Sequence, residues 1–330
     1  MDTYTDKYLT TPDKMLNPLR KYGVAIVPQI LTKAECKKLI NQTWTDLEYA
    51  TSAWKTPILR NNEETWSMSS FSLMHGMLSQ HHSIGHWPAA WYVRQHPEVA
   101  KIFGLLWNCE PPELLTSFDG VSISLPPETV GKGWFRPNSL WLHSDTSYYY
   151  DEDTTREDKR CYQSWITPVP VNAGDATLVF LEGSHKYHRN FSVEQELTSK
   201  DDWYKLSKEE VNIYTKEYNC ELLRVKCPAG SMVIWDSRLI HCGQQPLKER
   251  EEPNFRFCFY VCIMPRELVT KANLKKRIRA FEELRLTSHN PIRAKLFSKK
   301  PRAYDDVKLE TILPPAMPEL TKLGRKLVGY

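Results

Sequence analysis

Six short segments rich in Val, Ile, Phe, Tyr and Trp follow one another in this chain, and each is bounded by Pro, Gly, Asp or Asn. Such segments, with turn-forming residues at their ends, predict β-strands. The segments span residues 114–128, 139–147, 161–171, 176–184, 220–237 and 255–265. Six or more short strands with repeated turn signals indicate an antiparallel sandwich or barrel.

The segments on either side of this region predict helices. Residues 24–28 (VAIVP) predict one strand, and Thr32 with Glu35 forms a capping-box pattern that predicts the start of a helix. Another helix is predicted over 88–107. The expected organisation is one mainly β domain over 1–330, with a helical and βα layer at 1–113, the core at 114–265, and a basic helix and tail at 266–330.

The chain shows no sign of a membrane segment or an export signal. It contains no run of 18 apolar residues, and its first residues, MDTYTDKYLTTPDKM, are polar. None of its eight cysteines forms a C-x-x-C pair, which argues against a zinc finger or a thioredoxin-like redox motif. We expect a cytoplasmic protein with reduced, buried cysteines.

Charge is distributed unevenly along the sequence. Residues 266–330 hold 16 Lys or Arg against 7 Asp or Glu, although the net charge of the whole chain is only +4. A basic tail can bind nucleic acid or an acidic partner. The alternative, which we favour, is a solvated helix followed by an extended segment.

The clearest candidate site is the H-x-D pair His143 and Asp145 in the segment SLWLHSDT. Residues two apart in a strand project to the same face, so this imidazole and carboxylate could bind one metal ion. His241, in WDSRLIHCG at the end of an apolar strand, is the candidate third ligand 98 residues later. Two histidines and one carboxylate on one face of a metal are typical of non-haem Fe(II) oxygenases.

A basic residue follows these candidate ligands. Arg256 opens the strand RFCFYVCIMP, fifteen residues after His241. A planar guanidinium can bind a carboxylate through two hydrogen bonds, so Arg256 is a natural anchor for a dicarboxylate cosubstrate.

With these motifs the chain resembles the phytanoyl-CoA dioxygenase-like (PhyH) superfamily over roughly residues 17–265. The matching elements are His143 and Asp145, the turn Gly183-Ser184-His185-Lys186, the segment from Trp235 and Asp236 to His241 and Gly243, and Arg256. The spacing departs from the family at the last element. Glu252 stands where the family often has its arginine, so Arg250 competes with Arg256 for that role.

The resemblance implies a double-stranded β-helix (jelly-roll, cupin-like) core, with Fe(II) and 2-oxoglutarate as cofactors and O2 as cosubstrate. His143, Asp145 and His241 would hold the iron, and Arg256 would bind the distal carboxylate of 2-oxoglutarate. The implied activity is hydroxylation of a C–H bond, in a small-molecule substrate, with release of succinate and CO2.

Further residues are candidates for the same site. Ser122 and Ser124 alternate on the strand VSISL and could contact the cosubstrate. The candidates for the substrate pocket are Trp141, Thr146, Tyr148 and Trp165, although Trp141 could equally be an ordinary core residue. We expect His185 to be structural and Asp236 to orient the turn before His241.

Two segments outside the strands are expected to form a mobile rim around the substrate cavity, 66–87 and 188–216. The first region includes four close histidines (His75, His81, His82, His86), which we interpret as surface or cleft residues rather than as metal ligands. Loops on a rigid scaffold commonly carry binding residues.

Three other functions are compatible with this fold. The first is a cupin-type metal enzyme that does not use 2-oxoglutarate, and the second is a binding protein without chemistry. The third is an oxygenase that acts on a nucleic acid or a protein, with the basic C-terminal segment as a possible contact. Arg256 argues against the first, and the intact ligand set argues against the second.

Overall fold

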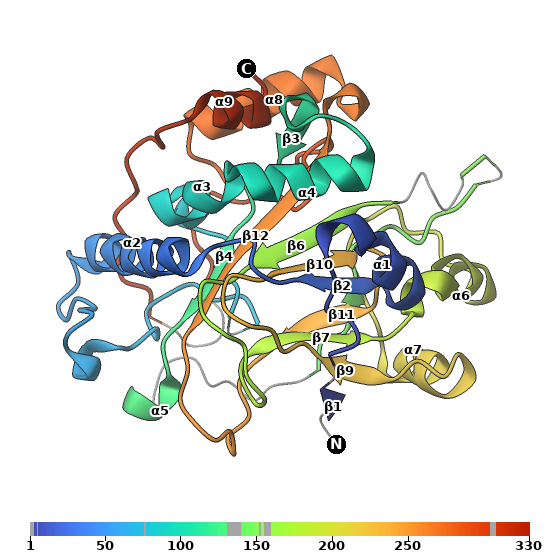
Figure 1. Ribbon diagram of the computed structural model, residues 1–330, viewed down its shortest axis with the longest axis horizontal. Coiled ribbons are helices and arrows are strands. Elements are labelled where there is room, and N and C mark those ends of the chain that lie inside the picture. The colour runs from blue at the N-terminus through green and yellow to red at the C-terminus, as the bar shows by residue number, and fades with distance from the viewer. Residues whose placement is uncertain are drawn as a thin grey trace.

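The strand-rich region folds into two sheets that enclose a shared apolar layer (Figure 1). The computed structural model describes residues 3–4, 6–75, 77–130, 140–151, 153–154, 160–303 and 308–330. One sheet has the strand order β1-β9-β7-β11-β5-β8, and the other has the order β2-β10-β6-β12-β3, with β4 also paired to β12. Except for the parallel pair β1 and β9, all of these strand pairs are antiparallel. This is the expected jelly-roll core.

The strands have the following bounds. The first sheet contains β1 (Thr3–Tyr4), β5 (His143–Ser144), β7 (Thr177–Leu181), β8 (Tyr204–Lys205), β9 (Leu222–Arg224) and β11 (His241–Gln244). The second contains β2 (Val24–Val27), β3 (Leu114–Thr116), β4 (Val121–Ser124), β6 (Tyr162–Ile166), β10 (Met232–Asp236) and β12 (Arg256–Pro265).

Each of the six predicted segments contains at least one strand, but the segments are divided differently. Two of them, 114–128 and 220–237, each hold two strands rather than one. The segment 139–147 forms only the two-residue strand β5, and its first residue, Ser139, lies outside the described residues. The strand that carries the third ligand was assigned wrongly: β10 ends at Asp236, and His241 begins the next strand, β11.

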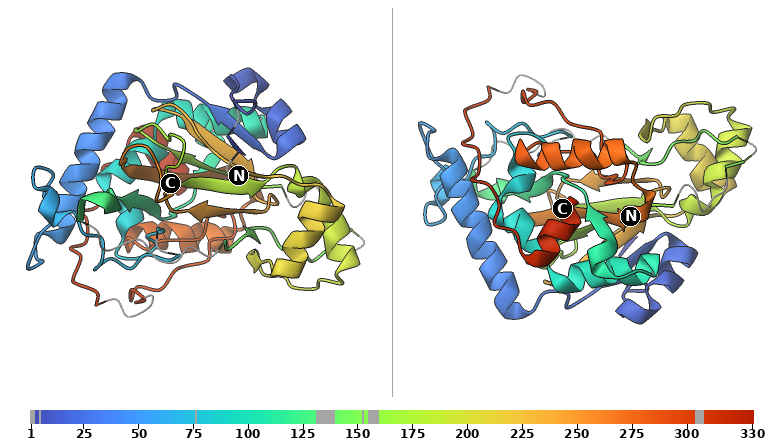
Figure 2. Two further views of the ribbon diagram at one scale, coloured as in Figure 1. Left: turned by 90° about the horizontal axis from the view of Figure 1, so that it is seen from below. Right: turned by 90° about the horizontal axis from the view of Figure 1, so that it is seen from above.

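Helices cover the sheets from several sides. They are α1 (Leu16–Tyr22), α2 (Lys33–Thr51), α3 (Pro88–Arg94), α4 (Pro97–Trp107), α5 (Pro127–Val130), α6 (His188–Glu194), α7 (Lys208–Asn212), α8 (Lys271–Glu282) and α9 (Lys322–Val328). In both views of Figure 2, α8 (orange) lies on the opposite side of the sheets from α1 (dark blue). None of the helices in the described ranges has the length and apolar composition needed to cross a membrane.

The N-terminal layer largely follows the prediction. The capping box at the start of α2 is confirmed: Thr32 accepts from the Glu35 amide, and the Glu35 carboxylate accepts from the Thr32 amide at 2.8 Å. The single helix predicted over 88–107 is wrong, because Pro97 disfavours helical geometry at the preceding residue, and the chain forms α3 and α4 instead.

The C-terminal segment is fastened to the core rather than simply solvated. After α8, Leu284 adopts a left-handed conformation (φ 49°) that ends the helix. The Arg277 guanidinium is buried and donates to the carbonyls of Thr116 (2.7 Å) and Val328 (2.9 Å), so it joins α8, β3 and α9. Seven of the eight cysteines are buried, and all eight are free thiols, as the sequence predicted.

Candidate metal centre

Strand pairing brings the two histidines together. His241 on β11 lies directly opposite His143 on β5 in the antiparallel register. β10 stops at Asp236 because its carboxylate accepts from the backbone and guanidinium of Arg238 (3.0, 2.8 and 2.6 Å), which closes a tight turn before β11. This is the orienting role expected for Asp236.

Each imidazole is fixed by a backbone carbonyl two residues earlier. His143 Nδ1 lies 3.2 Å from the carbonyl oxygen of Trp141, and His241 Nδ1 lies 2.8 Å from that of Leu239. Both Nε2 atoms are therefore left facing the same point. They lie 3.5 Å and 3.4 Å from Oδ2 of Asp145, whose carboxylate lies between them.

Asp145 is held in place from two directions. Its amide donates to the carbonyl of Ser237 (3.0 Å), and Gln163 Nε2 donates to its Oδ2 (2.9 Å). Burial alone would raise the pKa of this carboxyl group, but the imidazoles of His143 and His289 hold the pKa well below its usual range. The carboxylate is therefore ionised and available as a ligand.

These residues fit a metal ion. One ligand atom from each of His143, Asp145 and His241 lies within 4.8 Å of the others. Two neutral imidazole nitrogens and one carboxylate oxygen on one side of the ion are the donor set of non-haem iron(II) oxygenases. The backbone acceptors behind both imidazoles fix the ring orientation, as is usual for histidine ligands.

Arg256 has the properties expected of a carboxylate anchor. Its side chain is only 3% exposed and borders the cavity above the metal ligands. It donates to Ser122 Oγ (2.8 Å) and to the carbonyl of Ala176 (2.8 Å), with a long contact to the Tyr260 hydroxyl (3.5 Å). Within the described ranges no carboxylate pairs with this guanidinium.

Arg250, the competing candidate, forms ion pairs outside the cavity. Its guanidinium pairs with Glu128 at 2.7 Å and with Asp175 at 3.0 Å, and it does not border the metal cavity. Of the two candidate serines, Ser122 supports Arg256 and donates to the carbonyl of Met77 (2.8 Å). Ser124 is buried opposite Arg256 in the strand register, away from the cavity wall.

A cavity of about 590 Å³ opens over the metal ligands. Its inner wall is made by residues of the core strands and the turns beside them: Trp141, His143, Asp145, Gln163, Leu178, Trp235, His241, Gly243, Arg256 and Tyr260. Its outer wall is made by residues of the loops outside the core strands: Met74, His75, Leu78, Gln80, Asp119, Lys200, Asp201, Asp202, Trp203, Ser288, His289, Arg293, Lys295 and Phe297.

Both predicted rim segments contribute to the outer wall, the first through Met74, His75, Leu78 and Gln80 and the second through residues 200–203. Their mobility stays a prediction. Of the four histidines near 80, only His75 borders the cavity, and its ring stacks on Trp141 at 3.7 Å. Trp141 in turn stacks on His143 at 4.5 Å, so it serves the site as a wall and as a support for a metal ligand.

The structure does not place the other three pocket candidates on the cavity wall. The hydroxyl of Thr146 pairs with that of Ser237 (2.6 Å), because the chain turns away from the cavity after Asp145. Tyr148 is buried without bordering the cavity, and its ring stacks on that of His188. Trp165 lies in the layer between the sheets, with the Arg256 guanidinium 5.8 Å from its ring.

Sequence reasoning missed the C-terminal part of the outer wall. Five residues between 288 and 297 border the cavity, although the tail was interpreted as a solvated helix and extended segment. Asp119 was also missed, since it lies in the turn between β3 and β4. No motif marks either group, and only the chain's return to the core brings them to the cavity.

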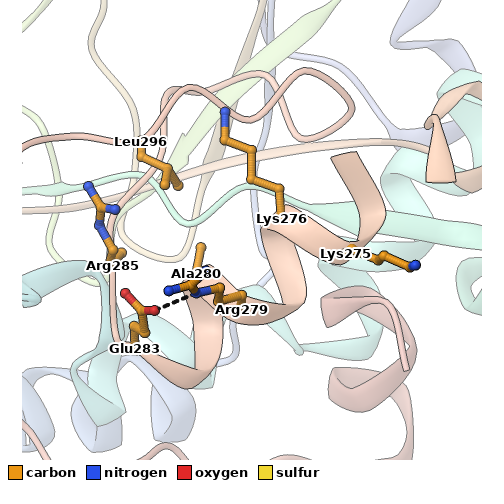
Figure 3. A pocket seen from close by; sticks show the side chains of 7 residues that line it. All are labelled: Lys275, Lys276, Arg279, Ala280, Glu283, Arg285 and Leu296. Carbon is orange, nitrogen blue, oxygen red and sulfur yellow. Dashed lines mark hydrogen bonds and ion pairs between the residues drawn. The ribbon is translucent and has the colours of Figure 1, made fainter. Parts of the chain in front are cut away.

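The basic residues of α8 line a different hollow (Figure 3). This hollow, of about 430 Å³, is also lined by Arg285 beyond the end of α8, and Arg279 pairs with Glu283, four residues along the chain, at 2.7 Å. It shares no lining residue with the metal cavity.

Comparisons with known proteins agree with this geometry. The model of the phytanoyl-CoA dioxygenase (PhyH) family matches residues 19–246. A curated relative, "Ava biosynthesis cluster protein O" of Aspergillus versicolor, is 25% identical over 240 residues, which cover 70% of this chain and 72% of the relative.

Two solved structures share the fold. A hypothetical protein of Escherichia coli superposes with a TM-score of 0.58 at 13% identity, over 98% of this chain and 85% of that one. The GlcNAc-inducible gene 2 protein of Candida albicans gives a TM-score of 0.51 at 14% identity, over 84% of this chain and 68% of that one. The family match covers most of the chain and contains all three metal ligands, so the chain belongs to the phytanoyl-CoA dioxygenase family and is an iron(II)- and 2-oxoglutarate-dependent oxygenase.

Proposed function

We propose that this enzyme hydroxylates a C–H bond of a small molecule, with release of succinate and CO2. The observation that carries the proposal is the shared cavity, in which three metal ligands face the same space as an arginine that pairs with no carboxylate of the described residues. Iron(II), when bound, supplies the activation of O2 that an unreactive C–H bond requires.

Each part of the site has a proposed role. His143, Asp145 and His241 hold the iron, and Arg256 binds the distal carboxylate of 2-oxoglutarate through its free donor directions. Ser122 keeps the Arg256 side chain extended toward the cavity. The aromatic inner wall, including Trp141 and Trp235, limits the access of water to the metal.

The size of the cavity supports a small-molecule substrate. A volume of about 590 Å³ falls in the range of ligand pockets that bury most of a small compound. The Aspergillus relative is described as a biosynthesis cluster protein, which supports the same class of substrate. We also propose that residues 1–330 act as one domain, because the N-terminal layer, the core and the C-terminal segment each supply part of the cavity wall.

The test is succinate release by the iron(II)-loaded enzyme across a broad panel of metabolites. We expect 2-oxoglutarate-dependent succinate formation that a subset of compounds stimulates, with one hydroxylated product per succinate. An enzyme that modifies a substrate without consuming 2-oxoglutarate would contradict the proposal. The His143→Ala variant is the control for succinate formed without the metal site.

A further inference from the structure

Asp119 is a buried carboxylate in the cavity that the metal chemistry does not use. It is 8% exposed and borders the cavity from the outer wall. Its Oδ1 accepts from the amide of Gly120 (2.6 Å) and from Gln80 Nε2 (3.2 Å). Its Oδ2 accepts no hydrogen bond from any residue in the described ranges, and none of their cationic side chains pairs with it.

The backbone around Asp119 is fixed, so the position of its carboxylate is built into the fold. The buried Arg94 guanidinium donates to the main-chain carbonyls of Asp119 and Gly85. A Cβ atom on Gly120 would come within 2.0 Å of the Ser79 carbonyl oxygen, which shows how closely the two backbones pack. Arg94 thus supports the main chain behind Asp119 and leaves the carboxylate directed toward the cavity.

Such a group is costly unless something pairs with it. A buried carboxylate loses its hydration and requires a partner to recover that free energy. Burial is the largest influence on the pKa of Asp119 and raises it, while the Gly120 amide and then His289 act in the opposite direction. A ligand that brings a positive charge to Oδ2 would recover the most free energy.

None of the lysine and arginine side chains that border the cavity in the described ranges pairs with Asp119. Arg256 faces the cosubstrate position, and Lys200, Arg293 and Lys295 are exposed at the mouth. Arg293 lies 3.8 Å from Asp202 on the opposite side of that mouth. The interior next to Asp119 also contains Gln80, whose amide could accept a second N–H from a ligand.

We propose that Asp119 recognises a cationic nitrogen on the substrate, as a protonated amine or a guanidinium group, through its open Oδ2. Gln80 provides a neighbouring polar contact, and Trp203, on the same wall, offers aromatic surface that favours a cation. The inference rests on the proposed function in one respect, namely that the bound cation belongs to the substrate. The binding of a cation to Asp119 can be measured without turnover.

Binding to the full chain loaded with Ni(II) and 2-oxoglutarate tests the proposal, because this form holds the site together without reacting. The probes are 2-phenylethylamine, the neutral 2-phenylethanol and the anionic 3-phenylpropionate, compared by calorimetry. We expect the amine to bind at least about tenfold more tightly than the alcohol, as a charge-assisted hydrogen bond predicts. Equal binding of amine and alcohol, preference for the anion, or no binding of the amine overturns the proposal.

Two variants test whether Asp119 is the source of the preference for the amine. Asp119→Asn should remove about tenfold of the amine affinity and leave alcohol and 2-oxoglutarate binding within about twofold. Asp201→Asn, which neutralises an exposed carboxylate of the same wall, should change neither. Unchanged amine binding in Asp119→Asn overturns the assignment. If Asp119→Asn does not fold, the relative affinities of the three probes for the unmodified protein still test whether the cavity prefers a cation.

Failure of this proposal is distinguishable from failure of the proposed function. Succinate release by the iron-loaded enzyme reports the reaction, whereas calorimetry on the nickel form reports only recognition. An active enzyme without amine preference would refute Asp119 alone.

Discussion

The two walls of the cavity are built by different means. The inner wall comes from strands in register, where His143 and His241 are neighbours on β5 and β11 and Arg256 opens β12. The outer wall comes from three parts of the chain far apart in sequence, which lie around residues 74–75 and 78–80, at 200–203 and at 288–297, together with Asp119. The sheet thus fixes the groups that the reaction needs, while the surrounding segments shape the space for the substrate.

The largest effect should come from the inner wall. His143→Ala or His241→Ala removes one of three protein ligands, and each should abolish iron retention and turnover. Asp145→Ala should abolish turnover for the same reason. Metal content by elemental analysis and succinate release are the measurements. Full 2-oxoglutarate-dependent activity in His143→Ala would refute the assignment of the metal centre.

The comparison of two arginines tests the inner wall further. Arg256→Ala should leave iron bound but weaken 2-oxoglutarate binding by about 2–3 kcal/mol, or roughly 30- to 150-fold. Arg250→Ala, which breaks the pairs with Glu128 and Asp175, should alter stability and change the 2-oxoglutarate requirement much less. Reversed effects would identify Arg250 as the anchor.

Acid should weaken the support of the outer wall through the buried His86. His86 accepts from Trp91 Nε1 (3.2 Å), and its other nitrogen contacts the carbonyl of Arg285 (3.0 Å), just before the 288–297 stretch. Burial lowers the pKa of His86 from 6.5 to about 3. The unfolded chain therefore binds a proton that the folded chain does not, and stability present above pH 6.5 is lost as the pH falls toward 3.

At pH 4 this loss should amount to roughly 3 kcal/mol of the free energy of unfolding. Urea unfolding as a function of pH measures it, and His86→Gln, which cannot titrate, should flatten the profile in that range. An equally steep profile in His86→Gln would assign the acid sensitivity to other groups.

The smallest effect should come from the mouth of the cavity. Arg293 and Asp202 join the two sides of the outer wall at 3.8 Å, and the arginine side chain is largely exposed. Arg293→Ala should therefore change stability by less than about 0.5 kcal/mol. It should nevertheless raise hydrogen exchange at 200–203, which 2-oxoglutarate and a redox-inert metal should lower. Unchanged exchange under both conditions would refute a mobile rim.

The difference between the walls also explains what the sequence could predict. His143, Asp145 and His241 lie in short motifs whose spacing and strand context are local, and the family resemblance adds the expected core. The bounds of β10 and β11 were missed because the turn at Asp236 depends on a side-chain contact with Arg238. Thr146 and Tyr148 were misplaced because they were chosen only for following the metal pair in sequence, whereas the chain turns away from the cavity after Asp145.

The outer wall was only partly predictable, because long-range packing creates it. Composition indicated 66–87 and 188–216, but nothing local marks His289 or Asp119 as cavity residues. The positions of His289 and Asp119 depend on buried arginines that hold chain segments against the core, such as Arg277 beneath α9 and Arg94 behind Asp119. A buried arginine bonded to carbonyls has no sequence signature.

The single pair that joins β5 to β11 has a consequence for folding. β5 is two residues long, and His143 opposite His241 is its one residue pair with β11. A slip of one residue along this pair would turn one histidine to the other face of the sheet. An ion bound by both side chains would disfavour that slip and would stabilise the native state over the unfolded chain. Bound iron would therefore cross-link β5 to β11 and hold this short strand in register, in addition to its part in the reaction.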